Sequence, residues 1–397
     1  MAAYDAEVIV VGGGPAGSTT ASLLASRGHD VLVLDRARFP REKPCAEYMS
    51  PGVEDVLRRV GVWDDVAAEP HARPRGMRIM TGRSSFLLSY PDGSRCRAAL
   101  GIDRPTFDRV LLDHARSCGA SVREDSHVLR VLTEDGRVVG VRARTPDGER
   151  EYRSRFVVGA DGLRSVVSRS LGLDTRSRAP RRLGLVARYR GARDIAAGGE
   201  MHVGRGFYCG LAPVGGDLIN VGLVVPLAAK PRGDSIARFF ERWLERLPHG
   251  LESLHAACRV TPIHGMGSLA RRVSRSAGPG YLLVGDAAGF LDPFTGEGVY
   301  RALRGAELAA DAVEEALDDA RRMPRGYEQA RNHEFGAKER VCTLVQLFLR
   351  NDRLFDSVVE HLARRPAVAA QLGGILGDYR PANAALRPAF LWSLLRP

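Results

Sequence analysis

The chain opens with a pattern that predicts a strand, a glycine-rich turn, a helix and a second strand that ends in an acidic residue. This pattern limits the possible folds more than any other segment. Residues 8–11 are an apolar run typical of a buried parallel strand. Residues 12–17 follow with the GxGxxG spacing, and residues 18–26 keep a helical pattern of small and apolar side chains. A second apolar run at 31–34 ends at Asp35. A βαβ unit of this kind predicts an α/β fold with a parallel sheet.

Each glycine of the first turn has a physical role in dinucleotide binding. Gly12 permits the tight turn, Gly14 lets the backbone approach a pyrophosphate, and Gly17 lets the helix pack closely on the strand. The start of the helix supplies free N–H groups and a positive dipole end for phosphates. Asp35 is placed to accept a hydrogen bond from a ribose hydroxyl. The turn therefore predicts a dinucleotide site and leaves NAD and FAD both open, while the alternative is an ordinary glycine turn.

Two further junctions between an apolar run and a glycine turn lie far downstream. Residues 156–165 contain Gly159-Ala160-Asp161-Gly162, and residues 281–289 contain Gly285-Asp286-Ala287-Ala288. The second of these continues through residues 296–299, Gly-Glu-Gly-Val, into a long helical pattern. Three such junctions so far apart predict one sheet that receives strands from distant parts of the chain. A one-pass NAD domain would not need them.

The three motifs in this order resemble the FAD-dependent oxidoreductases of the aromatic hydroxylase type, the group A flavin monooxygenases. That superfamily also holds geranylgeranyl reductases and flavin-dependent halogenases. Its pattern is GxGxxG at the start, GADG-x-x-S in the middle and GD-A-A before the last helix of the FAD domain. Residues 41–46 and 50–52 look like the R-x-K-P-C-G…S-P segment of the reductase-like branch, with Ala46 in place of the usual glycine. The resemblance covers about residues 5–330 and implies a glutathione-reductase-like Rossmann FAD domain.

The resemblance also implies roles for single residues. Arg104 would reach the FAD phosphates, the backbone at Val128 would meet adenine, and Asp286 would contact the ribityl or pyrophosphate part. Asp161 and Gly162 resemble the segment that contacts FAD and, in hydroxylases, NAD(P)H. The alternatives are a surface cation for Arg104 and a solvated helix cap for Asp161. The full set of predicted cofactor residues is Gly12, Gly14, Pro15, Ala16, Gly17, Asp35, Arg36, Arg41, Cys45, Ala46, Arg104, Val128, Asp161, Gly162, Gly285, Asp286, Pro293, Gly296, Gly298 and Val299.

The remaining patterns divide the chain into three regions. Residues 1–75, 98–175 and 275–330 are predicted to form a discontinuous FAD-binding domain. Two insertions, at 76–97 and 176–274, are expected to meet as an antiparallel substrate-binding sheet over the flavin, with Pro91-Asp92-Gly93 as the turn of the first hairpin. Helical apolar stripes at 342–349, 355–362 and 388–395 predict a helical C-terminal region over 331–397.

Three functions are compatible with these motifs. The leading hypothesis is a monooxygenase, a hydroxylase or epoxidase that uses NAD(P)H as reductant and O₂ as co-substrate. Its substrate would be a small to medium apolar or aromatic metabolite, in secondary metabolism such as antibiotic biosynthesis. The alternative is an enzyme like geranylgeranyl reductase, in which FADH₂ gives hydride to an alkene, and a second alternative is a non-catalytic flavin-binding protein.

The residues discriminate only partly among these functions. Residues 207–213, Phe-Tyr-Cys-Gly-Leu-Ala-Pro, occupy the place of a Y-x-W-x-F-P-like strand in reductases and W-x-W-x-I-P in halogenases, and neither Trp is present. That argues against a halogenase and against a typical prenyl reductase, whereas the segment around Cys45 favours the reductase branch. Candidate catalytic residues near the substrate are Cys45, Tyr48, His202 and Tyr208. The alternatives are a packed thiol for Cys45 and a structural ring for His202.

Composition and charge exclude several other classes of protein. The net charge of +11 is spread along the chain without a basic block, so nucleic acid is not expected as a partner. The six cysteines form no CxxC pair, and no metal site or disulfide framework is indicated. There is no apolar stretch long enough to span a bilayer and no signal-peptide pattern. A reducing cytoplasm is therefore the expected compartment. The protein is expected to be a monomer or a homodimer. The apolar tail at 390–395 is interpreted as docked core rather than as a peripheral membrane contact.

Overall fold

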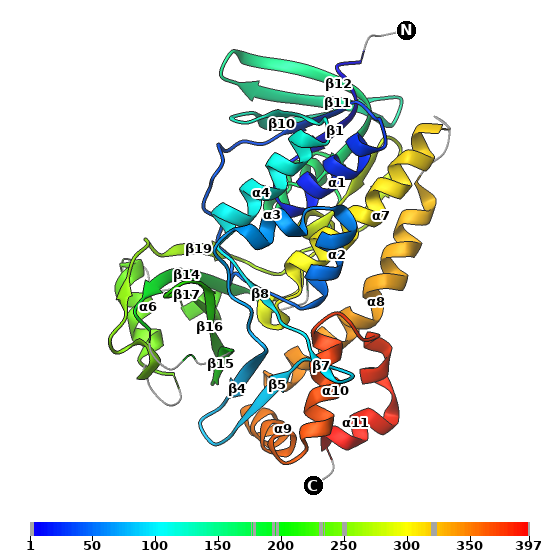
Figure 1. Ribbon diagram of the computed structural model, residues 1–397. Helices are drawn as coiled ribbons and strands as arrows, with labels where there is room; N and C mark the ends of the chain where they lie inside the picture. The colour runs from blue at the N-terminus through cyan, green and yellow to red at the C-terminus, as the bar shows by residue number, and fades with distance from the viewer. Residues whose placement is uncertain are drawn as a thin grey trace.

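The structure is a computed structural model that describes residues 4–175, 177, 180–192, 195, 198–229, 233, 235–247, 252–318 and 324–395. Its elements form a parallel sheet with covering helices, a second and mostly antiparallel sheet beside it, and a group of C-terminal helices (Figure 1). This is the mixed α/β architecture that the sequence predicts.

The first sheet collects strands from both ends of the predicted FAD domain. Its order is β10-β11-β12-β1-β2-β9, with β22 beside β12 and β21 beside β22. Strands β1, β2, β9, β12 and β22 are parallel, while β10 and β11 form an antiparallel meander with the long β12. The bounds are β1 Ala6–Val11, β2 Val31–Leu34, β9 Ser121–Arg123, β10 His127–Glu134, β11 Arg137–Thr145, β12 Gly148–Gly159, β21 Ala277–Gly278 and β22 Tyr281–Leu283.

Strand β1 is buried on both faces, which explains its continuous apolar run. Successive side chains of a strand point to opposite faces. Val8 and Val10 accordingly pack in one apolar cluster with the helices α1, Pro15–Ser26, and α7, Gly298–Asp318. Ile9 and Val11 pack in another cluster against the meander.

The second sheet joins strands from the two predicted insertions. Its order is β18-β14-β17-β16-β15-β4-β5, with β19 on β14, and all of its pairs are antiparallel except β15 with β4. The parallel pair is the junction between the two insertions. The bounds are β4 Gly76–Met80, β5 Ser85–Ser89, β14 Arg182–Arg190, β15 Gly199–Gly204, β16 Phe207–Gly215, β17 Leu218–Pro226, β18 Cys258–Arg259 and β19 His264–Gly267.

The predicted turn of the first hairpin is wrong. The hairpin of β4 and β5 turns at residues 81–84, where the amide of Thr81 donates to the carbonyl of Ser84. Residues 91–93 belong instead to a second, smaller hairpin of β6, Pro91–Asp92, and β7, Arg95–Cys96. A Pro-Asp-Gly sequence marks a turn correctly but does not say which strands it joins.

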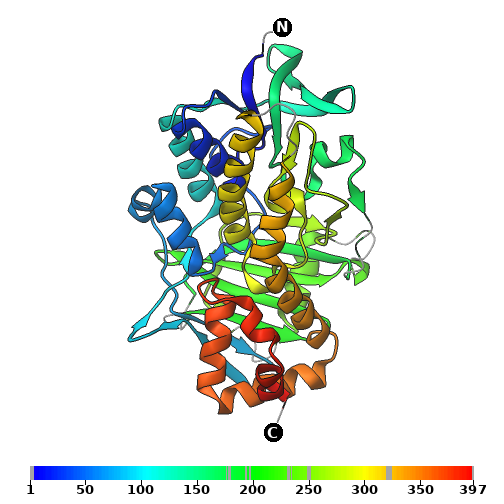
Figure 2. The same cartoon turned by 90° about the vertical axis from the view of Figure 1, so that its right-hand side faces the viewer.

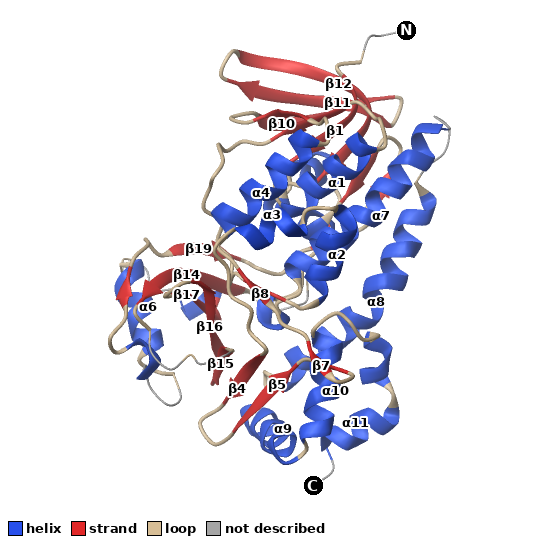
Figure 3. Ribbon diagram, viewed as in Figure 1, coloured by secondary structure: helices blue, strands red, loops and turns tan. Residues whose placement is uncertain are grey.

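Helices cover both sheets (Figure 3). Helices α4 and α7 both pack on α1 beside the first sheet, and α6 packs on β17 of the second. The remaining helices are α2 Gly52–Val60, α3 Trp63–Ala68, α4 Arg104–Ser117, α5 Val166–Ser170 and α6 Ile236–Leu244. Two short strand pairs complete the fold: β3, Tyr48–Met49, pairs with β8, Leu100–Gly101, and β13, Asp174–Thr175, pairs with β20, Arg272–Val273.

The C-terminal region is helical, as its apolar stripes predict. Helix α8, Arg325–Phe348, runs beside α7, and α9, Asp352–Arg364, α10, Pro366–Leu376, and α11, Pro388–Leu395, follow at the far end of the molecule (Figure 2). Helices α9 and α10 pack on strand β5. The sequence did not indicate α10, which carries a glycine pair in place of a regular stripe. A Cβ on Gly373 would lie 1.9 Å from the carbonyl oxygen of Ser89, so the glycine permits close packing of α10 on β5.

Candidate functional site

The three glycine junctions meet around one cavity of about 400 Å³. Gly12 and Gly14 line it from the first junction, Asp161 and Gly162 from the second, and Gly285 and Asp286 from the third. They meet because each follows the carboxyl end of a neighbouring strand, β1, β12 or β22, which is the edge where ligands of such sheets bind. Every predicted cofactor residue except Gly17 lines this cavity.

The first turn has the geometry that its glycines predict. Gly12 has φ of +101°, and a Cβ on it would lie 2.7 Å from the carbonyl oxygen of Ala160. A Cβ on Gly17 would lie only 1.8 Å from the carbonyl oxygen of Gly12. Gly17 therefore serves the packing of α1 against the turn. Helix α1 has no side-chain cap and begins with Pro15, so its first N–H groups remain available to an anion.

Asp35 shapes the loop beside the first turn. Its Oδ2 accepts a hydrogen bond from the amide of Gly13 at 2.6 Å, and its Oδ1 accepts one from the amide of Ala37 at 2.8 Å. Each carboxylate oxygen retains a second acceptor position. The predicted contact with a ribose hydroxyl stays a prediction, and Arg36 and Val128 line the same cavity.

A group of cations, Arg41, Lys43 and Arg104, lines the cavity. Arg104 is buried at 7% exposure and forms a bidentate pair with Asp108 at 2.7 and 2.8 Å, so the alternative of a surface cation is wrong. Arg41 lies 3.1 Å from the same carboxylate. Lys43 also lines the cavity, although it is not among the predicted cofactor residues. Burial lowers the pKa of Lys43, against the charge of Asp286.

Asp161 caps a helix and keeps one oxygen free of protein donors. Its Oδ2 accepts hydrogen bonds from the amides of Val166 and Val167 at 2.6 and 3.3 Å, at the start of α5. Its Oδ1 is buried without a hydrogen-bond partner among the described residues. Burial raises the pKa of Asp161 and also that of Asp286. A buried acceptor at the wall of a cavity fits a ligand that brings a hydroxyl or N–H donor.

These features fit FAD. Cations and an open helix start suit a pyrophosphate, and the orphaned Asp161 oxygen suits a sugar or ribityl hydroxyl. At the other end, Pro293, Gly296, Gly298 and Val299 line the cavity where α7 begins. Gly296 has φ of +68°, a backbone conformation that glycine adopts without strain.

The loop from Cys45 to Tyr48 is held by Glu47, which is not among the predicted site residues. Glu47 is 1% exposed and accepts hydrogen bonds from the amide of Arg104 at 2.8 Å, from Nε of Arg188 at 2.9 Å and from Nδ2 of Asn220 at 2.7 Å. These contacts tie the loop to β14 and β17. Cys45, Ala46 and Tyr48 consequently face the cavity. The partners of Glu47 lie far away in sequence, so no local signal marks it.

A second, apolar chamber of about 130 Å³ adjoins the cofactor cavity. The two share six residues: Ala46, Tyr48, Met201, Gly210, Pro293 and Gly296. Among the described residues that line the chamber, none is charged at neutral pH. The rest of its wall comes from β4, β5, β16 and the C-terminal helices, and includes Met77, Ile79, Phe86, Leu88, Ala212, Phe294, Val341, Phe348, Phe355, Val359, Leu362, Leu372 and Phe390.

Two phenols, those of Tyr48 and Tyr208, line the cofactor cavity close to the chamber. The hydroxyl of Tyr48 lies 2.8 Å from that of Tyr90, and the hydroxyl of Tyr208 donates to Oδ1 of Asp292 at 2.6 Å. Burial raises the pKa of Tyr48 and Tyr208 well above the usual value, so both keep their protons near neutral pH. Both line the cofactor cavity, and Tyr48 also lines the chamber.

The prediction that His202 lies near the substrate is wrong. His202 lines neither cavity, and its Nε2 lies 2.9 Å from Oε2 of Glu200. The reason is strand alternation, because the preceding residue, Met201, lines both cavities. The sequence does not say which face of a strand turns toward a cofactor when both faces are buried.

A parallel nucleotide-binding sheet with three glycine junctions, next to a second sheet and an apolar chamber, defines an oxidoreductase of the flavin-dependent class. The chain belongs to the FAD binding domain family, whose model matches residues 5–331. It is an FAD-dependent oxidoreductase, as its motifs predict.

Similar proteins agree with this assignment. The chain is 32% identical over 391 residues to digeranylgeranylglycerophospholipid reductase 1 of Methanopyrus kandleri, covering 94% of this chain and 98% of that protein. It is 30% identical over 324 residues to menaquinone reductase of Mycolicibacterium smegmatis, covering 78% and 76%. The crystal structure of a geranylgeranyl bacteriochlorophyll reductase-like protein from Thermoplasma acidophilum has a TM-score of 0.81 at 25% identity, covering 96% of this chain and 98% of that one. These relatives favour the alkene-reductase alternative over the monooxygenase that the sequence ranked first.

Proposed function

We propose that this protein reduces carbon–carbon double bonds in a long apolar substrate of the isoprenoid type. Reductases are among its similar proteins, and two of them have names that refer to geranylgeranyl compounds. The observation that carries the proposal is the uncharged chamber that opens onto the cofactor cavity. An apolar hydrocarbon gains about 0.8 kcal/mol for each CH₂ that it buries, and charged side chains in the wall would oppose this.

The size of the chamber bears on how the substrate is held. A dry cavity of about 150 Å³ accommodates a benzene ring, so a chamber of about 130 Å³ offers room for about one isoprene unit. A longer chain therefore requires side chains of α9–α11 to move aside. Helices α9 and α10 pack on strand β5, and α11 packs on α9.

Reduction of an alkene needs a hydride for one carbon and a proton for the other, and reduced FAD supplies the hydride. Within the chain, Tyr48 is the candidate to hold the proton, at its phenolic oxygen. Its hydroxyl lies at the boundary of the two cavities beside that of Tyr90. The apolar wall excludes water from the reacting atoms. Cys45 lines the cofactor side of this boundary, and its role near the flavin remains a proposal.

Anaerobic turnover tests the proposal. The FAD-loaded protein, reduced with dithionite under nitrogen, is expected to saturate double bonds of geranylgeraniol and to return to oxidised flavin at a matching rate. Mass spectrometry should show a gain of two hydrogens for each double bond reduced. A monooxygenase would instead require O₂ and add oxygen to the product. NAD(P)H as the physiological reductant stays a prediction, tested by the rate at which NADH or NADPH bleaches the flavin.

The chamber wall provides a second prediction. Ala212 lies on β16, is 3% exposed and lines the chamber. Replacing it with phenylalanine is expected to fill much of the space in the chamber. A substrate chain would then overpack the site, and overpacking a buried site costs about 1–3 kcal/mol. We expect Ala212→Phe to weaken geranylgeraniol binding about tenfold and to leave FAD affinity unchanged, as measured by titration. Ala363→Phe adds the same ring at an exposed position of α9 and serves as the control. Equal substrate affinity in both variants would contradict the chamber as the binding site.

A further inference from the structure

The loop between β2 and β3 forms one wall of the cofactor cavity. We call residues 36–46 of this loop the strap, and they contain no helix or strand. Residues 40–46 make no backbone–backbone hydrogen bond with the part of the chain that the structure describes. Side chains therefore hold this wall in place. The members of the strap that line the cavity are Arg36, Ala37, Arg41, Glu42, Lys43, Pro44, Cys45 and Ala46.

Two neighbouring residues tie the strap to different parts of the fold. Arg41 lies 3.1 Å from Oδ2 of Asp108 on α4, the helix that packs on α1 beside the first sheet. Glu42 accepts hydrogen bonds from Nη1 and Nη2 of Arg188 at 2.9 and 3.1 Å. Arg188 lies on β14 of the second sheet. The strap thus links the two halves of the fold beside the cofactor cavity.

Arg188 binds two carboxylates of the same loop. Its Nε and Nη2 also donate to the two oxygens of Glu47. The two partners differ in exposure, because the side chain of Glu42 is 42% exposed and that of Glu47 is 1% exposed. Water and salt weaken an exposed ion pair much more than a buried one. The pair with Glu42 can therefore open while the pair with Glu47 remains closed.

An exposed ion pair suits a contact that opens and closes. Segments with few backbone hydrogen bonds open at low free energy, and the strap is such a segment. A cofactor that lies behind the strap is free to leave when the strap opens. We propose that Glu42 and Arg188 form a latch that keeps the strap closed over bound FAD and sets the rate of FAD release. This inference concerns cofactor exchange and does not depend on the proposed reductase function.

Release of FAD from the oxidised, FAD-loaded protein tests the latch. The protein is diluted by rapid mixing, and flavin fluorescence reports the FAD that is released. At about 0.05 M NaCl, Glu42→Gln should release FAD about fivefold faster than the wild type, because glutamine keeps the size of the side chain without its charge. At about 1 M NaCl the two rates should agree within about twofold, because the screening length falls to about 3 Å and the wild-type pair is weakened too.

Arg188→Lys provides a second variant that keeps the positive charge. An ammonium group lacks the planar fork with which arginine binds two carboxylates at once. Both contacts of the loop with β14 are then weakened, the exposed one and the buried one. We expect this variant to release FAD roughly tenfold faster than the wild type or more, at either salt concentration.

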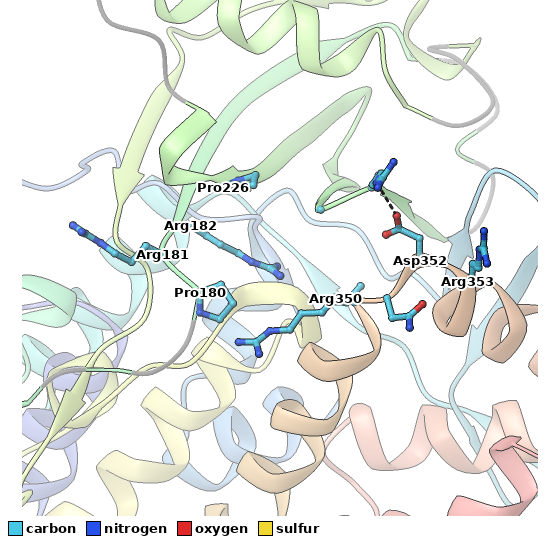
Figure 4. A pocket seen from close by; sticks show the side chains of 11 residues that line it. Pro180, Arg181, Arg182, Pro226, Arg350, Asp352 and Arg353 are labelled. Carbon is cyan, nitrogen blue, oxygen red and sulfur yellow. Dashed lines mark ion pairs between the residues drawn. The ribbon is translucent and has the colours of Figure 1, made fainter.

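Asp352→Asn is the matched control. Asp352 lies 3.5 Å from Arg205, in the turn between β15 and β16, and the dashed line in Figure 4 marks this pair. The side chain of Asp352 is 42% exposed, as is that of Glu42. Neither Asp352 nor Arg205 lines the cofactor cavity. Asp352→Asn should therefore release FAD at the wild-type rate.

The outcomes separate a latch from a general loss of packing. Wild-type release from Glu42→Gln at low salt would disprove the latch. Faster release that persists undiminished at high salt would also overturn the proposal, because the variant would then act through packing rather than charge. Equally fast release from Asp352→Asn would show that any exposed pair has this effect. All rates are measured without substrate, so a failure of alkene reduction leaves this test intact.

Discussion

Replacing Gly17 with alanine is expected to abolish FAD binding. The new Cβ would lie 1.8 Å from the carbonyl oxygen of Gly12 and 3.2 Å from Cβ of Ala160. Because the first obstacle is backbone, no rotamer change relieves it, and α1 must move away from the turn. That shift would displace the helix start that is predicted to hold the pyrophosphate. We expect FAD affinity, measured by flavin fluorescence on the purified protein, to fall at least 100-fold.

A second glycine provides the matched control. Gly336 lies within α8, where an added Cβ would meet nothing within 4 Å. Alanine stabilises the interior of a helix by roughly 0.5–1 kcal/mol relative to glycine. Gly336→Ala should therefore retain FAD and melt at the same or a slightly higher temperature. A Gly17→Ala protein that binds FAD like the wild type would disprove the close packing of α1 on the turn.

Replacing Lys338 with methionine is expected to destabilise the protein by about 3–5 kcal/mol, the usual cost of breaking a buried ion pair from one side. Lys338 is 5% exposed, pairs with Asp378 at 2.5 Å, and donates to the carbonyl oxygens of Ile375 and Leu376 at 2.9 and 3.2 Å. Oε2 of Glu297 lies 3.5 Å away. The lysine thus joins α8, the end of α10 and the loop that begins α7. Chemical denaturation would measure the loss.

The penalty in Lys338→Met should depend on pH. Burial raises the pKa of Asp378, and Lys338 opposes that effect. Without the lysine, the folded pKa of Asp378 rises further above its unfolded value of about 3.9. A carboxyl whose pKa is raised on folding favours the folded state below its unfolded pKa, and this contribution is lost as pH rises through the folded pKa. The variant should therefore lose stability as pH rises through the folded pKa of Asp378 and recover stability on acidification.

A double variant separates lost charge pairing from lost packing. Asp378 has φ of +62°, which asparagine also tolerates, so Asp378→Asn removes the charge with little backbone strain. In Lys338→Met/Asp378→Asn the methionine no longer leaves Asp378 charged and unpaired. The loss of unfolding free energy in the double variant should be smaller than the sum of the losses in the two single variants, by more than about 1 kcal/mol. Simple additivity, or a pH-independent penalty, would show that the cluster acts through packing alone.

Local patterns along the chain account for much of the fold. The three glycine junctions predicted the cofactor cavity because tight turns and close helix packing require glycine at fixed spacing. Apolar stripes predicted α8, α9 and α11, whereas α10 was missed because its packing uses glycine rather than a stripe. Of the three polar residues predicted to lie near the substrate, Tyr48 and Tyr208 line the cofactor cavity in the structure, whereas His202 lines neither cavity. The strand register decides which face of the sheet His202 occupies.

Sequence alone was sufficient for the parallel sheet, the dinucleotide site and the flavoenzyme class, because each strand with its glycine turn carries a local pattern and the order of the three motifs resembles that of a known family. Only the folded chain revealed Glu47 with Arg188 and Asn220, the buried Lys338 with Asp378, and the apolar chamber. Each of these brings together side chains separated by tens to hundreds of residues. Their pairing depends on how the sheets and helices pack, and a linear pattern carries no record of that packing.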